Sequence, residues 1–345
     1  MALWTLWYAS LLLAAASVVV MLLLVLRRVV QQHLSFRRER LRVAASAKLL
    51  DYLDGDATAA EVKAAAGGRG DIVGDLVFEM REMIRGEGQL KLAKLAASAG
   101  ALGYERRRLA ARNPAVRAEA ARRLGVYGGE AVPWLEAALD DRDPQVRTAA
   151  ALELTLQDAA PPLATLADRM RVGVDTYSED LRRVFRRAVA SETRIAGALL
   201  EDEWTSVQLR VLLLDGLGHA GDFTVLPAVI AMTQHPAADV RAEALRTLAN
   251  LGHPAAAAAA SEALADPDWP VRAQAANCVR RIGVDDAVPS LAALLDDPQW
   301  WVRFRAAEAL SALGNDGRAR LAAAAHRGDR AGQVAQLVLA ERGLA

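Results

Sequence analysis

The sequence predicts an all-α protein in which an N-terminal transmembrane helix leads to a small helical adaptor and then to an α-solenoid of about seven helical hairpins. Three observations predict this fold class. The first 26 residues carry no charged side chain, a Val-Arg step recurs at a nearly constant interval, and the apolar residues are mostly Ala, Leu and Val. Aromatic residues are only 5% of a chain that is 53% hydrophobic, which favours closely packed helices over sheets.

Residues 1–26 are predicted to be a membrane anchor. Leu3 to Leu26 are mostly apolar. As a helix they span roughly 36 Å, enough to cross a hydrocarbon core of about 30 Å. A cleaved signal peptide is the alternative, but such peptides open with a basic segment and have a shorter apolar run. The sequence therefore favours an uncleaved, single-pass anchor.

A basic cluster follows the apolar run, and its members are Arg27, Arg28, Arg37, Arg38, Arg40 and Arg42. By the positive-inside rule this cluster predicts an inner (cytoplasmic) membrane protein with its N-terminus outside and its C-terminal bulk in the cytoplasm. The cluster is interpreted as a topology signal on a solvated helix face. Recognition of anionic lipid is the alternative interpretation.

Residues 27–105 are predicted to form an arginine-rich stalk and a helical adaptor. Apolar side chains recur at helical spacing from Val30 to Leu49, so the membrane helix is expected to continue into the stalk. Thr58 and Glu61 have the spacing of a capping box ahead of a short helix.

Residues 106–345 are predicted to be a repeat array. The step recurs at Val116-Arg117, Val146-Arg147, Leu209-Arg210, Val240-Arg241, Val271-Arg272 and Val302-Arg303. From Leu209 onward the interval is 31 residues, and a degenerate unit is expected around Leu181-Arg182. Helix caps are expected at Asn113, Asp143 and Asp268, and helix-ending glycines at Gly128, Gly221, Gly252, Gly283 and Gly314. A second helix follows each glycine, and such short hairpins bury their apolar faces only by stacking.

The stretch "DPQWWVRFRAAEALSALG" fits the pattern D-P-x-x-x-V-R-x-x-A-A-x-x-L-x-x-x-G, which resembles the HEAT repeat in its short bacterial form, first associated with phycobilisome lyase subunits. The resemblance covers about residues 106–345 and implies a scaffold that serves many partners. It also implies a ladder of Arg and Asp contacts between successive repeats. The ladder arginines would be Arg117, Arg147, Arg210, Arg241, Arg272 and Arg303, the last three pairing with turn carboxylates such as Asp266 and Asp297. Ligand binding by these arginines is the alternative.

The order of anchor, stalk, adaptor and repeats is similar to that of bacterial membrane-anchored HEAT-repeat proteins. Some of these accompany membrane glycosyltransferases in exopolysaccharide systems. This resemblance implies a membrane-bound protein partner, with a glycosyltransferase as the candidate.

We expect no catalytic, cofactor or metal site. The five histidines show no metal-ligand spacing, and phosphate loops and nucleophile elbows are missing from the sequence. The 42 basic and 42 acidic residues cancel, which disfavours a nucleic-acid partner. HEAT-type bilin lyases and DNA glycosylases are enzyme precedents, but no tetrapyrrole pocket is marked and the chain is neutral. The single cysteine, Cys278, is expected to be a small buried core residue.

Trp269 and Trp300 align at the first turn of helices in adjacent repeats, and Trp301 follows directly. Packing between repeats is one interpretation of these rings. The other is an exposed aromatic ridge that contacts a partner, because tryptophan is enriched at interface hot spots. We therefore expect a membrane-tethered, non-enzymatic protein-protein interaction scaffold. A lipid or membrane-surface sensor acting through the basic stalk is the alternative.

Overall fold

The computed structural model describes residues 2–81, 83–84, 86–173 and 178–343, and these residues form helices and turns without any strand. The all-α prediction is confirmed. The chain divides into two compact units, Met1–Trp134 and Leu135–Ala345. The division falls inside helix α7 (Val132–Ala138).

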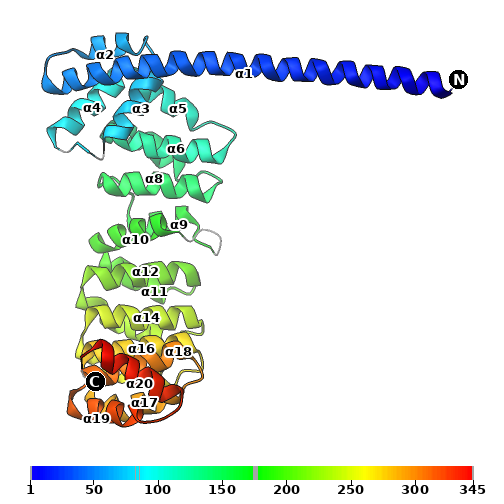
Figure 1. Ribbon diagram of the computed structural model, residues 1–345. Helices are drawn as coiled ribbons and strands as arrows, with labels where there is room; N and C mark the ends of the chain where they lie inside the picture. Colours follow the sequence, from blue (N-terminus) through cyan, green and yellow to red (C-terminus); the bar gives the residue numbers. More distant parts are fainter. Residues whose placement is uncertain (1, 82, 85, 174–177, 344–345) are drawn as a thin grey trace. The chain divides into compact units, whose positions relative to one another are not determined.

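The first unit begins with α1 (Ala2–Asp54), a continuous helix that contains both the apolar segment and the stalk (Figure 1). Among the described residues, one stretch of it, Ala16–Asp54, is long and apolar enough to cross a membrane, and none of its apolar window is buried. Every side chain from Val18 to Leu26 is between 51% and 60% exposed, so the apolar surface continues around the helix. Going along α1 from its N-terminus, the first fully buried side chains are those of Ala45 and Leu49, which pack against the rest of the unit.

The adaptor consists of α2 (Ala59–Ala65), α3 (Gly70–Met80), α4 (Glu87–Ser98) and α5 (Ala101–Arg108). Both α2 and α3 pack on α1, and α4 and α5 pack on α3. The capping box of Thr58 and Glu61 is confirmed, since each side chain bonds to the other residue's backbone N–H. These two bonds satisfy backbone N–H groups at the start of α2, which have no partner within the helix.

Seven helices of the described chain carry the Val-Arg step or its degenerate form, and we call them the Val-Arg helices. They are α6 (Pro114–Leu124) in the first unit and α8 (Pro144–Leu156), α10 (Glu179–Ser191), α12 (Val207–Ala220), α14 (Ala238–Leu251), α16 (Trp269–Ile282) and α18 (Trp300–Ala312) in the second. They alternate with α7, α9 (Leu163–Met170), α11 (Thr193–Glu201), α13 (Leu226–Ala231), α15 (Ala257–Glu262), α17 (Val288–Ala293) and α19 (Gly314–Ala325), and α20 (Arg330–Glu341) follows. The predicted array of helical hairpins is confirmed.

Local signals set the ends of these helices. Asn113 and Asp143 cap α6 and α8 through side-chain bonds, with proline in the first turn of each helix. Gly221, Gly252 and Gly283 end their helices in the left-handed conformation as expected. The expectation for the other two glycines is wrong. Helix α6 ends at Leu124, and Gly128 lies within the 3-10 helix Gly125–Ala131 that follows it. Helix α18 ends at Ala312, and Gly314 is the first residue of α19.

The core of the second unit lies between successive Val-Arg helices. Figure 1 shows them side by side from α10 to α18, and each packs directly on the next. At Gly216 a Cβ would come within 2.8 Å of Val189 Cβ, so glycine is needed for the close approach of α12 to α10. Cys278 is fully buried as expected, and burial raises the pKa of its thiol to about 12.

Candidate functional site

Each arginine of the Val-Arg step holds the turn before its own helix. The Nη1 atoms of Arg241, Arg272 and Arg303 donate to the carbonyls six and five residues earlier, at 2.8 to 3.0 Å. Arg117 and Arg147 do the same, and Arg210 donates to a carbonyl five residues earlier. This recurring contact stabilises the turns between repeats.

Among the contacts of the described residues, Arg241 and Arg272 each also reach a carboxylate of the next repeat, and we call each such contact a rung. Arg241 Nε lies 2.8 Å from Asp266 Oδ2, and Arg272 Nε lies 2.8 Å from Asp297 Oδ2. The side chains of Asp266 and Asp297 are only 10% and 4% exposed. Burial alone would raise the pKa of Asp266, but the Arg241 guanidinium and a backbone N–H outweigh it and lower that pKa. The rung from Arg241 therefore keeps the buried carboxylate of Asp266 ionised between repeats.

The expected pairing of Arg303 with a turn carboxylate is wrong. Within the described residues its guanidinium meets only the carbonyls of Asp297 and Pro298, and its Nε is buried without a hydrogen-bond partner. The capping role expected of Asp268 is also wrong. Its carboxylate accepts from Arg241 Nη2 at 2.9 Å instead of binding its own helix.

The predicted tryptophans lie partly exposed at the start of α16 and α18. Trp269, Trp300 and Trp301 are 41%, 42% and 52% exposed. Trp300 stacks on Phe304 with ring centroids 5.0 Å apart, and Trp301 meets Trp300 edge-on at 4.8 Å. We call Trp300, Trp301 and Phe304 the aromatic cluster. No ring contact joins Trp269 to it among the described side chains, so the rings do not form one continuous ridge.

The six stalk arginines divide into two sets. Arg38 Nη2 lies 2.7 Å from Asp75 Oδ2, and Arg42 Nη2 lies 2.7 Å from Glu79 Oε2, with both carboxylates on α3. Asp75 also accepts from Arg123 of α6, so one carboxylate joins the stalk to the first Val-Arg helix. The other four are exposed and form no ion pair in the described chain, and they are Arg27, Arg28, Arg37 and Arg40. The first set fixes the stalk, and the second remains accessible.

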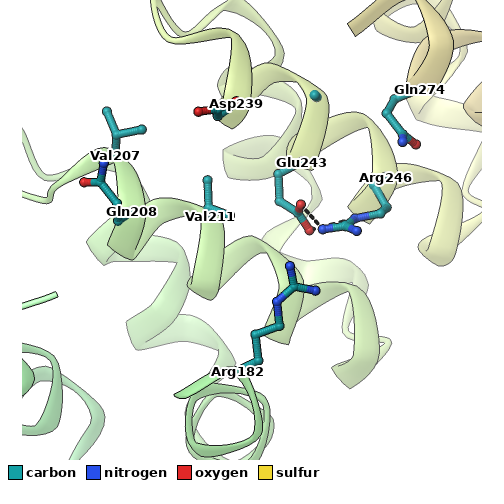
Figure 2. Close-up of a pocket in the computed structure, with 9 residues that line it drawn as sticks. Arg182, Val207, Gln208, Val211, Asp239, Glu243, Arg246 and Gln274 are labelled. Atoms are coloured by element: carbon teal, nitrogen blue, oxygen red, sulfur yellow. Dashed lines mark hydrogen bonds and ion pairs between the residues drawn. The ribbon is translucent and has the colours of Figure 1, made fainter. Parts of the chain in front are cut away.

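A cavity of about 430 Å³ opens on the face formed by the Val-Arg helices of the second unit (Figure 2). Within it the Glu243 carboxylate accepts from Arg246, and Arg182 points towards this pair from α10. The remaining lining residues are Val207, Gln208, Val211, Asp239, Ala242 and Gln274. Charged groups of both signs and two amides suit a polar segment with donors and acceptors better than a purely apolar ligand.

Sequence reasoning missed this cavity and two aromatic residues. A signal for the cavity was present, because Glu243 lies on the helical stripe of Val240, Ala244 and Leu248, which faces the core. Phe304 follows Trp300 by one helical turn, which also indicated a contact. Trp204, 93% exposed in the turn before α12, carries no repeat signature.

Replacing Glu243 by glutamine is expected to change how stability depends on pH. Burial raises the pKa of Glu243, and Arg246 offsets this only in part. A carboxyl with a raised folded-state pKa stabilises the fold fully below its unfolded pKa of about 4.3 and loses that contribution as pH rises through the folded value. The stability of Glu243→Gln relative to the native protein should therefore rise between about pH 4 and pH 7. Urea unfolding at both pH values measures this, with Glu179→Gln as an exposed control. A difference that stays constant with pH would contradict it.

The HEAT repeats family matches residues 106–189, 197–268 and 257–340. Three solved structures illustrate the similarity. YibA from Escherichia coli has 16% identity and a TM-score of 0.45, with 70% of this chain and 92% of that chain covered. A designed armadillo repeat protein has 17% identity and a TM-score of 0.34, and the match covers 62% of this chain and 100% of the designed protein. A chain in the complex of CpcE and CpcF of phycocyanin lyase from Nostoc has 21% identity and a TM-score of 0.28, and the match covers 79% of this chain and 94% of that one. No curated protein matches the sequence.

Proposed function

Because this chain belongs to the HEAT-repeat family, we propose that it is a membrane-tethered scaffold that binds another protein and does not itself catalyse a reaction. The aromatic cluster is the observation that carries the proposal. Its two tryptophans are about half exposed although they stand on a well-packed helix. Rigid, exposed aromatic rings supply a large contact area at little cost in side-chain entropy, which is typical of interface hot spots.

We propose that α1 anchors the protein, with its N-terminus outside and the repeats in the cytoplasm. The apolar surface around Val18 to Leu26, followed by Arg27 and Arg28, supports this orientation. An anchored scaffold meets a membrane-bound partner at a raised effective concentration, so modest contacts suffice for association. A membrane glycosyltransferase is the partner class that we favour, and only the resemblance in domain order supports that choice.

A lipid-sensing stalk is the second candidate function, and the geometry limits it. If Leu26 ends the hydrocarbon core of a helix along the bilayer normal, Arg27 and Arg28 lie at the headgroups. Arg37 and Arg40 then lie about 16 to 21 Å from Leu26 along the helix axis. This places them outside the headgroup layer, at a distance from it of roughly one Debye length or more, where salt screens the attraction to anionic lipid. The remaining two arginines are engaged with α3. Since two of the six meet the lipid surface, the topology role is the better supported one.

The double substitution Trp300→Ala, Trp301→Ala is expected to weaken binding of the partner by about 100-fold or more, because each ring is a candidate hot spot. Mild-detergent purification of the full-length protein from its native cells identifies the membrane protein that accompanies it. Titration of that partner against each reconstituted variant then measures the loss.

Trp204→Ala is the matched control, since it removes an even more exposed tryptophan from another turn of the same unit. It should retain binding. A large fall in the melting temperature of the double variant would show that Trp300 and Trp301 serve packing between repeats. If the double variant is folded and still binds the partner, the aromatic cluster is not the surface that contacts the partner.

A further inference from the structure

The turn that follows α19 carries no rung carboxylate. In the preceding rung Asp297 receives Arg272, and one repeat of 31 residues later the chain has Gly328. The neighbouring Arg327 pairs with Asp296 at 2.5 Å, so the turn of residues 326–329 lies beside the turn of residues 296–298. The position that would complete a third rung therefore has no side chain.

Arg303 is consequently left with one edge of its guanidinium unpaired. The residue is only 7% exposed, and its Nε is buried without a hydrogen-bond partner. Asp329, the next carboxylate along the turn, does not compensate. Its Oδ1 accepts from the first backbone N–H groups of α20, and its Oδ2 accepts from Arg327. A buried charged donor without an acceptor is unfavourable, so an acceptor supplied from outside would bind with advantage.

The open rung begins at a buried atom, Arg303 Nε, and ends at the exposed turn position of Gly328. Trp300 lies three residues before Arg303 on the same helix, a spacing at which side chains are neighbours. Gly328 is exposed, and apart from its two chain neighbours no residue has an atom within 4 Å of the place where its Cβ would be. A carboxylate entering here has room, and the residues beside it would meet the exposed rings.

We propose that a partner protein completes the open rung with an aspartate or glutamate side chain and places an adjacent apolar side chain on Trp300 and Trp301. The proposal rests on the scaffold function above and specifies the chemistry of the segment that binds. Charge complementarity is the reason for this occupant, because a basic or wholly apolar segment would leave Arg303 unpaired.

The substitution Gly328→Asp tests the proposal by supplying the carboxylate from within the chain. Gly328 is not in the left-handed region, so aspartate fits its backbone. We expect the melting temperature of Gly328→Asp to rise by roughly 2 to 4 °C, and binding of an acidic segment to weaken by about 10-fold to 100-fold. Gly328→Asn adds a side chain of the same size without the charge. It should raise the melting temperature and weaken binding much less than Gly328→Asp does.

The probe is a random octapeptide library displayed on phage and selected on the full-length protein in detergent. Enriched peptides should carry Asp or Glu beside an apolar residue, and tryptophan fluorescence should give their affinities. Binding should weaken by about 10-fold to 100-fold in Arg303→Leu and in Gly328→Asp but be kept in Gly328→Asn.

Two results would overturn the inference. One is enriched peptides without an acidic residue, and the other is equal binding to Gly328→Asp and the native protein. If binding then still depends on Trp300 and Trp301, the scaffold function stands without the rung. If no enriched peptide depends on either tryptophan, both proposals fail.

Discussion

Replacing Arg272 by leucine is expected to lower the free energy of unfolding by about 3 to 5 kcal/mol. The Arg272 guanidinium pairs with the carboxylate of Asp297, whose side chain is 4% exposed. Leucine keeps the bulk but leaves this buried charge without its counterion. Denaturant unfolding followed by circular dichroism measures the loss.

Arg303→Leu is the matched control, because it removes the same residue one repeat later, where no carboxylate is paired. Its expected loss is about 1 to 3 kcal/mol, from the unsatisfied turn carbonyls alone. Adding Asp297→Asn to Arg272→Leu should recover part of the loss by removing the buried charge. Equal losses in the two leucine variants would mean that the rung contributes nothing beyond the turn contact.

Placing arginine at both Leu12 and Leu13 is expected to release the protein from the membrane. Both side chains are more than 70% exposed on α1 and lie near the middle of the apolar run. Two arginines at the centre of a spanning helix cost about 5 to 7 kcal/mol of insertion free energy on the biological insertion scale. Alkaline carbonate extraction of isolated membranes should leave the native protein in the pellet and move the variant to the supernatant.

Gln31→Arg with Gln32→Arg is the control for this variant. It adds the same charge to the same helix, but beyond the apolar run, and should stay in the pellet. A Leu12→Arg, Leu13→Arg variant that also stays in the pellet would contradict the anchor. Recovery of a native protein shortened at its N-terminus would instead support a cleaved signal peptide.

Features that depend on neighbours in sequence were predictable. The Val-Arg interval located the stacked helices, Asn113 and Asp143 marked two caps, and Thr58 with Glu61 marked a third. Each of these signals acts within one or two helical turns, so a short stretch of sequence contains both partners. The rungs of Arg241 and Arg272 were predicted only through the resemblance to the HEAT repeat, because 25 residues separate each arginine from its carboxylate.

Features that bring together distant residues were not predictable. Nothing near Arg38 in sequence indicates that Asp75 would hold it, and nothing near Arg303 indicates that Asp329 would turn to Arg327. The cavity around Glu243 needs side chains from four helices at once. Hydrophobic periodicity identifies the buried face of each helix. It does not identify the residue with which a charged side chain on that face forms an ion pair.

Local sequence signals thus specified the helical class, the repeat register, the caps at Thr58, Asn113 and Asp143, and the apolar segment of α1. The tertiary structure decided which arginines are engaged, which carboxylates are buried, where the cavity opens and that one rung lacks its acceptor. The physical reason is the range of the interactions. Helix periodicity and capping are local, whereas burial and ion pairing depend on which side chains the packing of successive repeats brings within a few ångströms.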